Sequence, residues 1–585
     1  MVQLRLLSPA PESPLAVRLL QTAAGLGITD AETAASELAG REPSGAGAFA
    51  VDVAGLAKAW SEPALGRLAD WAQRCRQPLL LVVTDDAPAT RRLLGELTGG
   101  VLGEVAVVAA AAAVSFAAEA RPVVEELAGS EHRRQPGPAL HFAAGTCTPL
   151  MRVGGGASFV SWAAGGAPRF AWATPSILDP VTPLRAEVDF EHALDRVLPL
   201  VIFLRQALGE AVWTNPHRDA GFVIDDPLLV PRYGFIDFPA LLQSARRHAY
   251  HVTLAFIPWN AWRTREAQAR LFREHADCFT VCVHGCDHNR NEYGVADYPL
   301  LADKNRVALE RMERLVRRTG IPFASVMVCP QEQCSREGWR SFADTPGLLG
   351  MVNTACLPRN TPNDRVAVVD LLQPAHDRYF GFPIFKRYYP GDWAQFALTA
   401  FLGRPAILVE HHDFFRQGLG GIEDFVVRLR GISPRVQWRP MADLVTTTHQ
   451  RRRGPEGRLE VRFFTDRFRF EPLGAQGPVA FRRYVETVEA VEAVLVDGSP
   501  VPFTLEGPFV GFTLERAEAR EIEVRLRRPR PRRVYSHSAW HQGGVVVRRI
   551  LSEFRDNLLA RSPRAAALGR GLVGRLGWRG GARTR

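Results

Sequence analysis

In the central part of the chain, apolar and polar positions follow two different patterns. Between residues 216 and 450, short apolar runs are separated by segments in which apolar residues recur every three or four positions. The runs predict buried strands, and the segments predict amphipathic helices. This order is typical of a (β/α) barrel, whose strands all end at one face. The expected strands are 221–226, 251–259, 278–285, 322–330 and 405–415, and the expected helices are 237–249, 264–276 and 300–320.

The first section of the chain, residues 1–138, predicts an α/β domain of Rossmann-like type. Apolar runs at 48–56 and 78–86 predict parallel strands, and 61–76 between them has helical spacing. The polar, proline-containing stretch 130–138 predicts a domain boundary. We expect residues 139–215 to form a connecting segment of short strands and turns, which ends in a helix at 189–208.

Beyond the break RRRGPEG at 451–457, apolar and polar residues alternate one by one. This pattern is typical of strands with one exposed face, so residues 455–530 predict a β-rich domain. Residues 531–585 predict a basic helical tail, interrupted by Pro563 and several glycines. The tail holds twelve arginines and two acids, which accounts for the whole net charge of +10.

Composition limits the classes of protein that fit this sequence. The hydrophobic fraction of 46% is that of a globular protein, and 585 residues are too many for one compact core. The eight cysteines include no CxxC pair. The sequence shows no secretory leader, and its longest apolar run, 105–118, is shorter than the roughly 20 residues that cross a bilayer. We therefore expect a multidomain cytoplasmic protein, with peripheral attachment to a membrane left open.

The basic tail suits three kinds of partner. A solvated arm without a partner is the simplest interpretation. An anionic membrane surface is the next, because leucines, valines and Trp578 are interleaved with arginines. Nucleic acid is the least favoured, because no recognised binding module accompanies the arginines. The oligomeric state is not predicted.

Ionisable residues gather where two of the expected barrel strands end. Asp225 and Asp226 end the run GFVIDD, and His284 and His288 lie in HGCDH after the run CFTVCV. Two imidazoles and one carboxylate can hold a divalent metal while leaving a position open for water. Zn2+ suits these ligands best, and Co2+, Ni2+ or Fe2+ are alternatives.

Two neighbouring features offer competing interpretations. Asp85 and Asp86, in VVTDDAP, imitate the acidic pair, but they lie about 200 residues before the histidines and across the expected boundary. Cys286, between the two histidines, could be a ligand, although a packed thiol is the simpler interpretation. The glycines of VGGGAS at 153–158 predict a turn and not a phosphate-binding loop.

In this order, the motifs of residues 221 to about 415 resemble those of the polysaccharide deacetylases, the NodB-like carbohydrate esterases. FVIDDP resembles their first motif, VHGCDH the second, VMVCPQEQ the third, GDW at 391–393 the fourth and ILVEHHD the last. The resemblance implies a distorted (β/α)7 barrel. It also implies metal-dependent hydrolysis that removes N-acetyl groups from an amino sugar or glycan precursor.

The resemblance further implies a role for each residue of these motifs. Asp226, His284 and His288 would be the metal ligands, and Asp225 the general base that activates water. The general acid would be His412 or His411, and His412 is preferred because a His-Asp pair follows the apolar run.

One departure from the family pattern keeps alternatives open. The third motif normally offers an arginine that orients the catalytic aspartate, but residues 327–329 are Met, Val and Cys; Arg336 is one candidate to replace it. Residues 329–331 would line the pocket, with a backbone N–H helping to hold the oxyanion. Without the arginine, the chain could be an inactive glycan-binding or scaffold protein. A hydrolase of another bond type, an amidase or a glycosidase, is the other alternative.

Overall fold

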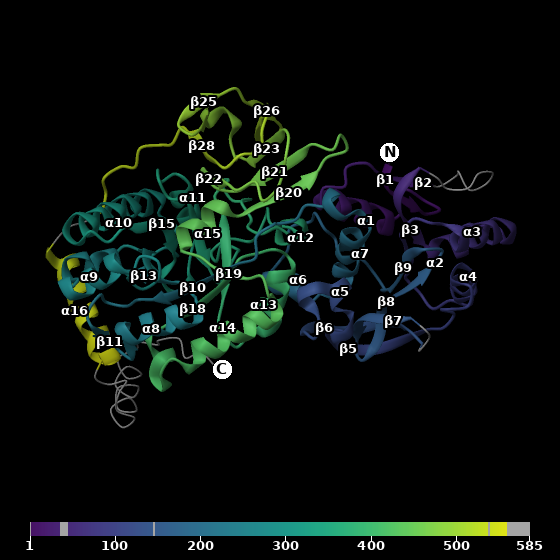
Figure 1. Ribbon diagram of the computed structural model, residues 1–585, viewed down its shortest axis with the longest axis horizontal. Helices are drawn as coiled ribbons and strands as arrows, with labels where there is room; N and C mark the ends of the chain where they lie inside the picture. Colours follow the sequence, from purple (N-terminus) through teal and green to yellow (C-terminus); the bar gives the residue numbers. More distant parts are fainter. Residues whose placement is uncertain (1, 35–44, 144–146, 536–538, 558–585) are drawn as a thin grey trace.

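The computed structural model describes residues 2–34, 45–143, 147–535 and 539–557. In Figure 1 a sheet with its helices lies at the N-terminal end, a barrel at the opposite end, and a smaller all-β part above the barrel. The expected α/β class is confirmed, because strands and helices alternate through the first two parts.

The central part is a closed barrel of seven parallel strands. Each strand pairs with the next along the chain, and the first strand pairs with both the second and the last, which closes the ring. The sequence predicted this barrel and five of its strands. The strands are β10 (Asp219–Asp225), β13 (Val252–Phe256), β14 (Phe279–His284), β15 (Phe323–Val328), β16 (Gly350–Asn353), β17 (Ile384–Tyr388) and β18 (Ala406–Glu410).

Helices surround this barrel, and α8 (Phe238–His248), α9 (Glu266–Glu274) and α10 (Tyr298–Thr319) lie where the apolar spacing of the sequence predicts helices. The longest is α10, which begins where the Asp297 carboxylate accepts a hydrogen bond from the Leu300 N–H and ends at Gly320 in a left-handed conformation. The others are α11 (Arg336–Ala343), α13 (Trp393–Phe401) and α14 (Gly420–Ile432).

The N-terminal sheet has nine strands in the order β2-β1-β3-β4-β9-β8-β6-β5-β7. It is parallel from β2 to β9 and antiparallel beyond β9. The expected boundary at residue 138 falls inside β6, and the sheet continues to Ala173. Its strands are β1 (Val2–Leu7), β2 (Ala31–Ala34), β3 (Ala46–Asp52), β4 (Leu79–Val83), β5 (Val105–Phe116), β6 (Glu131–Phe142), β7 (Thr148–Val153), β8 (Gly156–Ala164) and β9 (Ala167–Ala173).

Five helices and a broken segment accompany this sheet. The single helix expected at 189–208 is wrong, because the chain breaks into α6 (Glu187–Glu191), one 3₁₀ turn and α7 (Leu198–Leu208). Pro199 in the first turn of α7 lacks the N–H that a continuous helix needs. The other helices are α1 (Pro14–Gly25), α2 (Val53–Ala59), α3 (Glu62–Arg74), α4 (Pro88–Thr98) and the short α5 (Arg121–Val124).

Residues 449–526 form two sheets, of five and four strands, with a shared apolar core rich in phenylalanine. The strands alternate buried and exposed positions, as the period of two in the sequence predicts. They are β20 (His449–Arg453), β21 (Leu459–Phe463), β23 (Val479–Tyr484), β27 (Phe509–Leu514) and β26 (Thr504–Glu506), and β22 (Arg467–Phe470), β28 (Arg520–Leu526), β24 (Val491–Val496) and β25 (Ser499–Val501).

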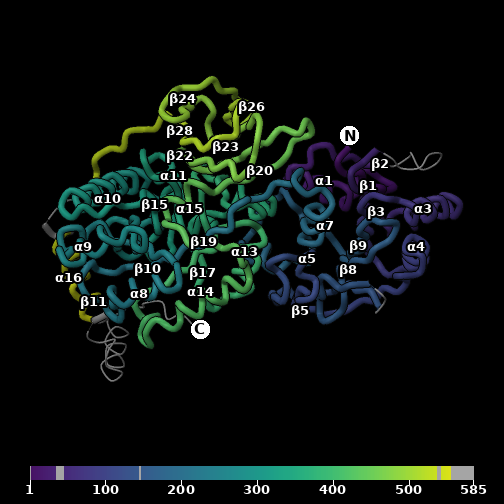
Figure 2. The backbone as a smooth tube through the Cα atoms, in the orientation of Figure 1, coloured from purple at the N-terminus to yellow at the C-terminus, as the bar shows by residue number. Residues whose placement is uncertain are grey.

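After β28 the chain returns to the barrel and forms helix α16 (Ala539–Asn557). Figure 2 shows this segment, in yellow, beside α9 at the edge of the barrel. The remainder of the expected basic tail, 558–585, lies outside the described residues. Within the described part of the chain, no helix combines the length and the apolar character needed to span a bilayer.

Candidate metal centre

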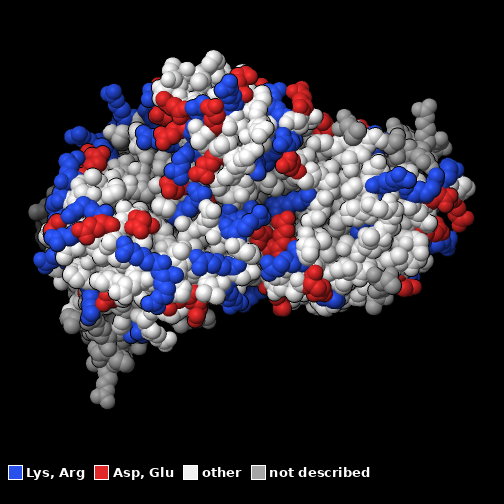
Figure 3. Space-filling view, in the orientation of Figure 1, with Lys and Arg blue, Asp and Glu red and all other residues white. Residues whose placement is uncertain are grey.

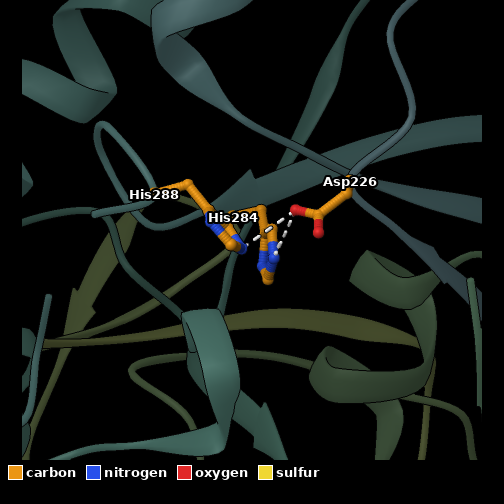
Figure 4. Close-up of side chains that lie close together, drawn as sticks. All are labelled: Asp226, His284 and His288. Carbon is orange, nitrogen blue, oxygen red and sulfur yellow. Dashed lines mark ion pairs between the residues drawn. The ribbon is translucent and has the colours of Figure 1, made fainter. Parts of the chain in front are cut away.

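Three side chains expected to bind metal lie together at the carboxyl ends of the barrel strands. The Asp226 Oδ1 atom lies 3.1 Å from His284 Nε2 and 3.0 Å from His288 Nε2 (Figure 4). Asp226 follows β10 and His284 ends β14, and both strands pair in parallel with β13 between them, which brings the two residues to the same end of the barrel. Potential ligand atoms of the three residues all lie within 4.8 Å of one another. The Asp226 side chain is 26% exposed, so the group can be reached from solvent.

The hydrogen bonds of His284 show that a positive charge is required between His284 and Asp226. Its Nδ1 atom lies 3.0 Å from the Val328 carbonyl oxygen, which can only accept, so Nδ1 carries the proton. In the neutral ring, Nε2 then presents a lone pair to the Asp226 carboxylate. Two acceptors at this separation require a positive charge between them, either a proton or a metal ion. The donor set therefore fits a divalent cation.

The backbone is strained at two of the three residues. Asp226 has a φ of 72° and His288 a φ of 57°, in the left-handed region that favours glycine. Such conformations cost of order 1–3 kcal/mol each and persist where surrounding contacts fix them. The fold therefore holds these two side chains at an energetic cost.

The loop between the two histidines is organised around the buried Glu292 carboxylate. It accepts hydrogen bonds from the backbone N–H groups of Cys286, Asp287 and His288, at 3.2, 3.0 and 3.0 Å. Lys304 of α10 lies 3.3 Å from the same carboxylate and balances its charge. Glu292 thus sets the direction in which His288 leaves the loop.

Cys286 and Gly285 complete this loop. The Cys286 thiol is buried, and burial raises its pKa well above the usual value, as expected for a packed thiol. Gly285 has a φ of 64°, and a Cβ atom there would lie 2.4 Å from Cγ of Pro330. Pro330, expected from the sequence to line the pocket, therefore packs directly against the histidine loop.

The candidate base Asp225 is fully engaged by an arginine. Arg387, on β17, donates two hydrogen bonds of 2.8 Å to the two oxygens of Asp225, and both side chains are buried. Burial alone would raise the pKa of Asp225, but the guanidinium outweighs it, and the pKa is lowered. Asp225 is therefore ionised at neutral pH.

Arg387 therefore contacts Asp225 in place of Arg336, which the sequence offered as one candidate. Arg336 begins α11 and pairs at 2.9 Å with the exposed Asp364. The fourth motif also has another role, because Asp392 accepts a hydrogen bond from the Gln395 N–H and starts α13. Trp393 stacks on Phe425.

The two candidate acids, His411 and His412, point in different directions. His411 Nε2 lies 4.0 Å from Asp225 Oδ2, and its side chain is 40% exposed. His412 is buried, with its ring against Tyr233 and stacked on Phe235. The structure thus brings His411, and not the preferred His412, to the candidate base.

The competing acidic pair lies in the N-terminal sheet, away from the barrel strands. Asp85 accepts hydrogen bonds from Lys58, from Thr90 and from the Ala87 N–H just before α4. These contacts are those of a capping and surface residue, and they agree with the interpretation that favoured Asp225 and Asp226. The glycines at 154–155 form the turn between β7 and β8, as predicted.

The segment that follows the all-β part also reaches the centre. The Tyr535 hydroxyl donates a 2.6 Å hydrogen bond to Asp287, which Arg311 of α10 also contacts at 2.7 Å. Arg549 of α16 is buried, and its Nη2 lies 3.3 Å from Nδ1 of His288. A guanidinium only donates, so His288 accepts at Nδ1 in this arrangement.

Sequence reasoning missed Arg387, Glu292 and Arg549. Arg387 lies on β17, a strand of five residues whose sequence contains no long apolar run, so the pattern did not predict this strand. Glu292 could have been found as an acid shortly after the HxxxH motif, because a carboxylate often accepts the backbone N–H groups of a tight loop. No local signal places Arg549, which lies 261 residues after His288.

Similarity to known proteins was found only among solved structures. No family model and no curated protein matches the sequence. Among solved structures, a putative polysaccharide deacetylase from Mycobacterium smegmatis is similar, with 15% identity over 40% of this chain and 91% of its own, at a TM-score of 0.27. A family 4 carbohydrate esterase from Streptomyces lividans has 12% identity over 38% and 92%, at a TM-score of 0.23.

A CE4 family pseudoenzyme from Bacillus anthracis is also similar, with 11% identity over 40% of this chain and 68% of its own, at a TM-score of 0.26. Part of this chain resembles CE4 deacetylases.

Proposed function

We propose that the barrel is a divalent-metal-dependent hydrolase that removes an N-acetyl group from an amino sugar or glycan precursor. The observation that carries this proposal is the convergence of Asp226, His284 and His288 beside the ionised Asp225–Arg387 pair. A divalent cation, most simply Zn2+, held by the three ligands would lower the pKa of a water molecule and polarise the acyl oxygen.

The remaining groups supply the proton transfers that amide hydrolysis requires. Asp225 accepts a proton from the attacking water, whose oxygen forms the new bond to the acetyl carbon. Arg387 holds the Asp225 carboxylate in one orientation through two parallel hydrogen bonds. The candidate acid His411 lies next to this base, with its Nε2 atom 4.0 Å from Asp225 Oδ2.

Breakage of the carbon–nitrogen bond needs a proton on the leaving nitrogen. His411 is the residue that we assign to this step, because its ring is partly exposed while that of His412 is packed. The products are acetate and the free amine. The presence of Arg387 weakens the inactive-scaffold alternative, since the absence of an orienting arginine was its main support.

Adjacent carboxylates do not favour a glycosidase. Two catalytic carboxyl groups of a glycosidase flank the sugar bond about 5 Å or more apart, on different sides. Here the two carboxylates belong to adjacent residues, and Asp226 points to the two histidines, so the pair does not flank a sugar bond from both sides. An amidase that acts on other substrates would use the same chemistry. Only activity assays with different substrates distinguish it from a deacetylase of amino sugars.

Two measurements test the proposal. Metal analysis of the purified protein should find about one bound divalent ion, lost in Asp226→Ala and in His284→Ala but kept in Asp86→Ala. Acetate release from N-acetylated amino sugars should then require metal and fall steeply in Asp225→Asn. Metal content unchanged in both ligand variants would refute the ligand assignment, and metal binding without acetate release would favour the binding protein.

A further inference from the structure

Helix α16 has a docked face and an outward face of different character. Successive residues are about 100° apart around a helix, so Val545 and Arg549 share one face. Both are buried, and Val545 packs on Ile257 and Trp259 near the start of α9. Arg263, from the same turn as Trp259, forms a bidentate ion pair with Glu553. These contacts fix α16 against the rim of the barrel.

The outward face of α16 is an uninterrupted apolar stripe. Its side chains are between 37% and 58% exposed, although all are large and apolar. They recur at the three- and four-residue spacing of one helix face, opposite the docked one. No charged residue interrupts the stripe in the described part of the helix. Its members are Val546, Val547, Ile550, Leu551 and Phe554.

An exposed tryptophan and several arginines lie beside this stripe. Trp262 is 66% exposed, and it belongs to the same turn that holds α16 through Trp259 and Arg263. Arg530, Arg532 and Arg533, in the segment leading to α16, are exposed. Basic side chains also lie along the edge of the barrel that carries α9 and α10 (Figure 3). The sequence from residue 531 onward contains twelve arginines and two acids.

We propose that the outward face of α16 docks on an anionic lipid bilayer, and that the metal centre thereby acts on an amino sugar carried by a lipid. The second part rests on the proposed function; the first does not. A helix with an apolar stripe, basic flanks and a neighbouring tryptophan matches the chemistry of the bilayer interface. Arginines attract the anionic headgroups, and the stripe enters the apolar layer below them.

The other occupants fit the surface less well. A second copy in a symmetric dimer would place the arginine-rich segments of both copies near each other, with like-charge repulsion. A nucleic acid would use the arginines but would leave five apolar side chains in contact with water. Of these three occupants, the lipid surface is the one that satisfies both the stripe and the charge.

The docked face of α16 determines how far the proposed bilayer surface lies from the metal centre. Arg549 contacts His288 from the inner side of α16, so one helix separates the bilayer from the metal centre. The diameter of a helix with its side chains is about 10 Å. A sugar headgroup attached to a membrane lipid would have to span about this distance to reach Asp226.

Vesicle sedimentation with the full chain tests the docking. We expect the protein to sediment with vesicles of phosphatidylcholine and phosphatidylglycerol, and far less with phosphatidylcholine alone. The double variant Ile550→Glu and Phe554→Glu should reduce the partition coefficient at least tenfold, because two carboxylates would enter the interface. Both side chains are at least half exposed, so the melting temperature should not change.

Val427→Glu is the matched control, because Val427 is a 61% exposed apolar residue on α14 of the same barrel. It should sediment like the original protein. Failure of the original protein to bind the anionic vesicles would overturn the proposal, and so would undiminished binding of the double variant. A dimer that forms without vesicles and dissociates in the double variant would assign the stripe to a second copy.

The test separates this proposal from the proposed function. Asp226→Ala should lose metal and still sediment with the vesicles. If docking is seen, the rate of acetate release from an N-acetylated glycolipid in anionic vesicles should exceed that from the free sugar, and the double variant should abolish the difference. An equal rate on both substrates would reject the lipid-carried substrate while leaving deacetylation in place.

Discussion

Asp225 and Arg387 form a buried bidentate ion pair, although 162 residues separate them in the sequence. The pair joins β10 to β17 across the interior of the barrel, at the end where the three candidate metal ligands gather. Because Arg387 lowers the pKa of Asp225, the pair links the stability of the barrel to the protonation of its candidate base.

Arg387→Met should raise the pKa of Asp225, since burial would no longer be opposed by the guanidinium. The acidic limb of the pH–rate profile should then move to higher pH. Loss of one partner of a buried pair should also destabilise the fold by about 3–5 kcal/mol at neutral pH. Arg336→Met, which breaks only an exposed pair, should leave the profile in place; an unmoved limb in Arg387→Met would contradict this role.

The same pair gives stability a defined pH dependence. The pKa of Asp225 is lower in the folded protein than in the unfolded chain, so its contribution is complete above the ordinary aspartate pKa. That contribution is lost as the pH falls through the folded-state pKa. Urea denaturation at several pH values should show a smaller acid-induced loss of stability in Asp225→Asn than in the original protein.

Glu292→Gln should weaken metal binding without touching a candidate ligand. The carboxylate accepts three backbone N–H groups around His288, and a neutral amide would leave Lys304 without its counter-charge. Loss of such supporting contacts typically costs 10- to 100-fold in metal affinity. Titration with Zn2+ against a competing chelator measures the change, and Glu310→Gln on the surface of α10 is the control. An unchanged affinity would mean that the loop is fixed by other contacts.

Substitution of the two neighbouring histidines should separate chemistry from packing. His411→Gln should lower kcat by about 10²- to 10⁴-fold, the usual range for loss of a general acid, with little change in melting temperature. His412→Gln should mainly lower the melting temperature, because its ring packs against Tyr233 and Phe235. The reverse result would return the role of acid to His412.

Arg549→Gln should strengthen metal binding. An imidazole that binds metal through Nε2 carries its proton on Nδ1 and normally donates it to an acceptor. Arg549 instead directs a donor and a positive charge to Nδ1 of His288, whereas the glutamine carbonyl can accept. We expect about tenfold higher affinity for Zn2+ in the same titration. A lower affinity would show that the guanidinium supports the centre.

The sequence predicted the residues at the ends of the barrel strands better than it predicted the other residues that complete the site. Asp225, Asp226, His284 and His288 follow apolar runs, and parallel strands of a barrel bring such positions to one face. Local pattern therefore sufficed to place them together. It did not distinguish His411 from His412, because adjacent residues after a strand diverge according to the turn that follows.

Arg387 and Arg549 are residues of the site that the sequence patterns could not predict. Arg387 is identified only when the closing strands of the barrel are placed, since its partner lies on β10. Arg549 reaches His288 through the fold of the whole chain, and no short-range spacing encodes that contact. Such contacts depend on tertiary packing, which single-sequence patterns do not describe.

The position of α16 also matters for how the protein is handled. A protease cut or an early stop between residues 527 and 545 would leave all seven barrel strands intact, yet it would remove Arg549 from His288. The affinity of such a fragment for metal would differ from that of the complete chain. Preparations of different length could thus give conflicting metal contents, and mass spectrometry of each sample should accompany every measurement on this centre.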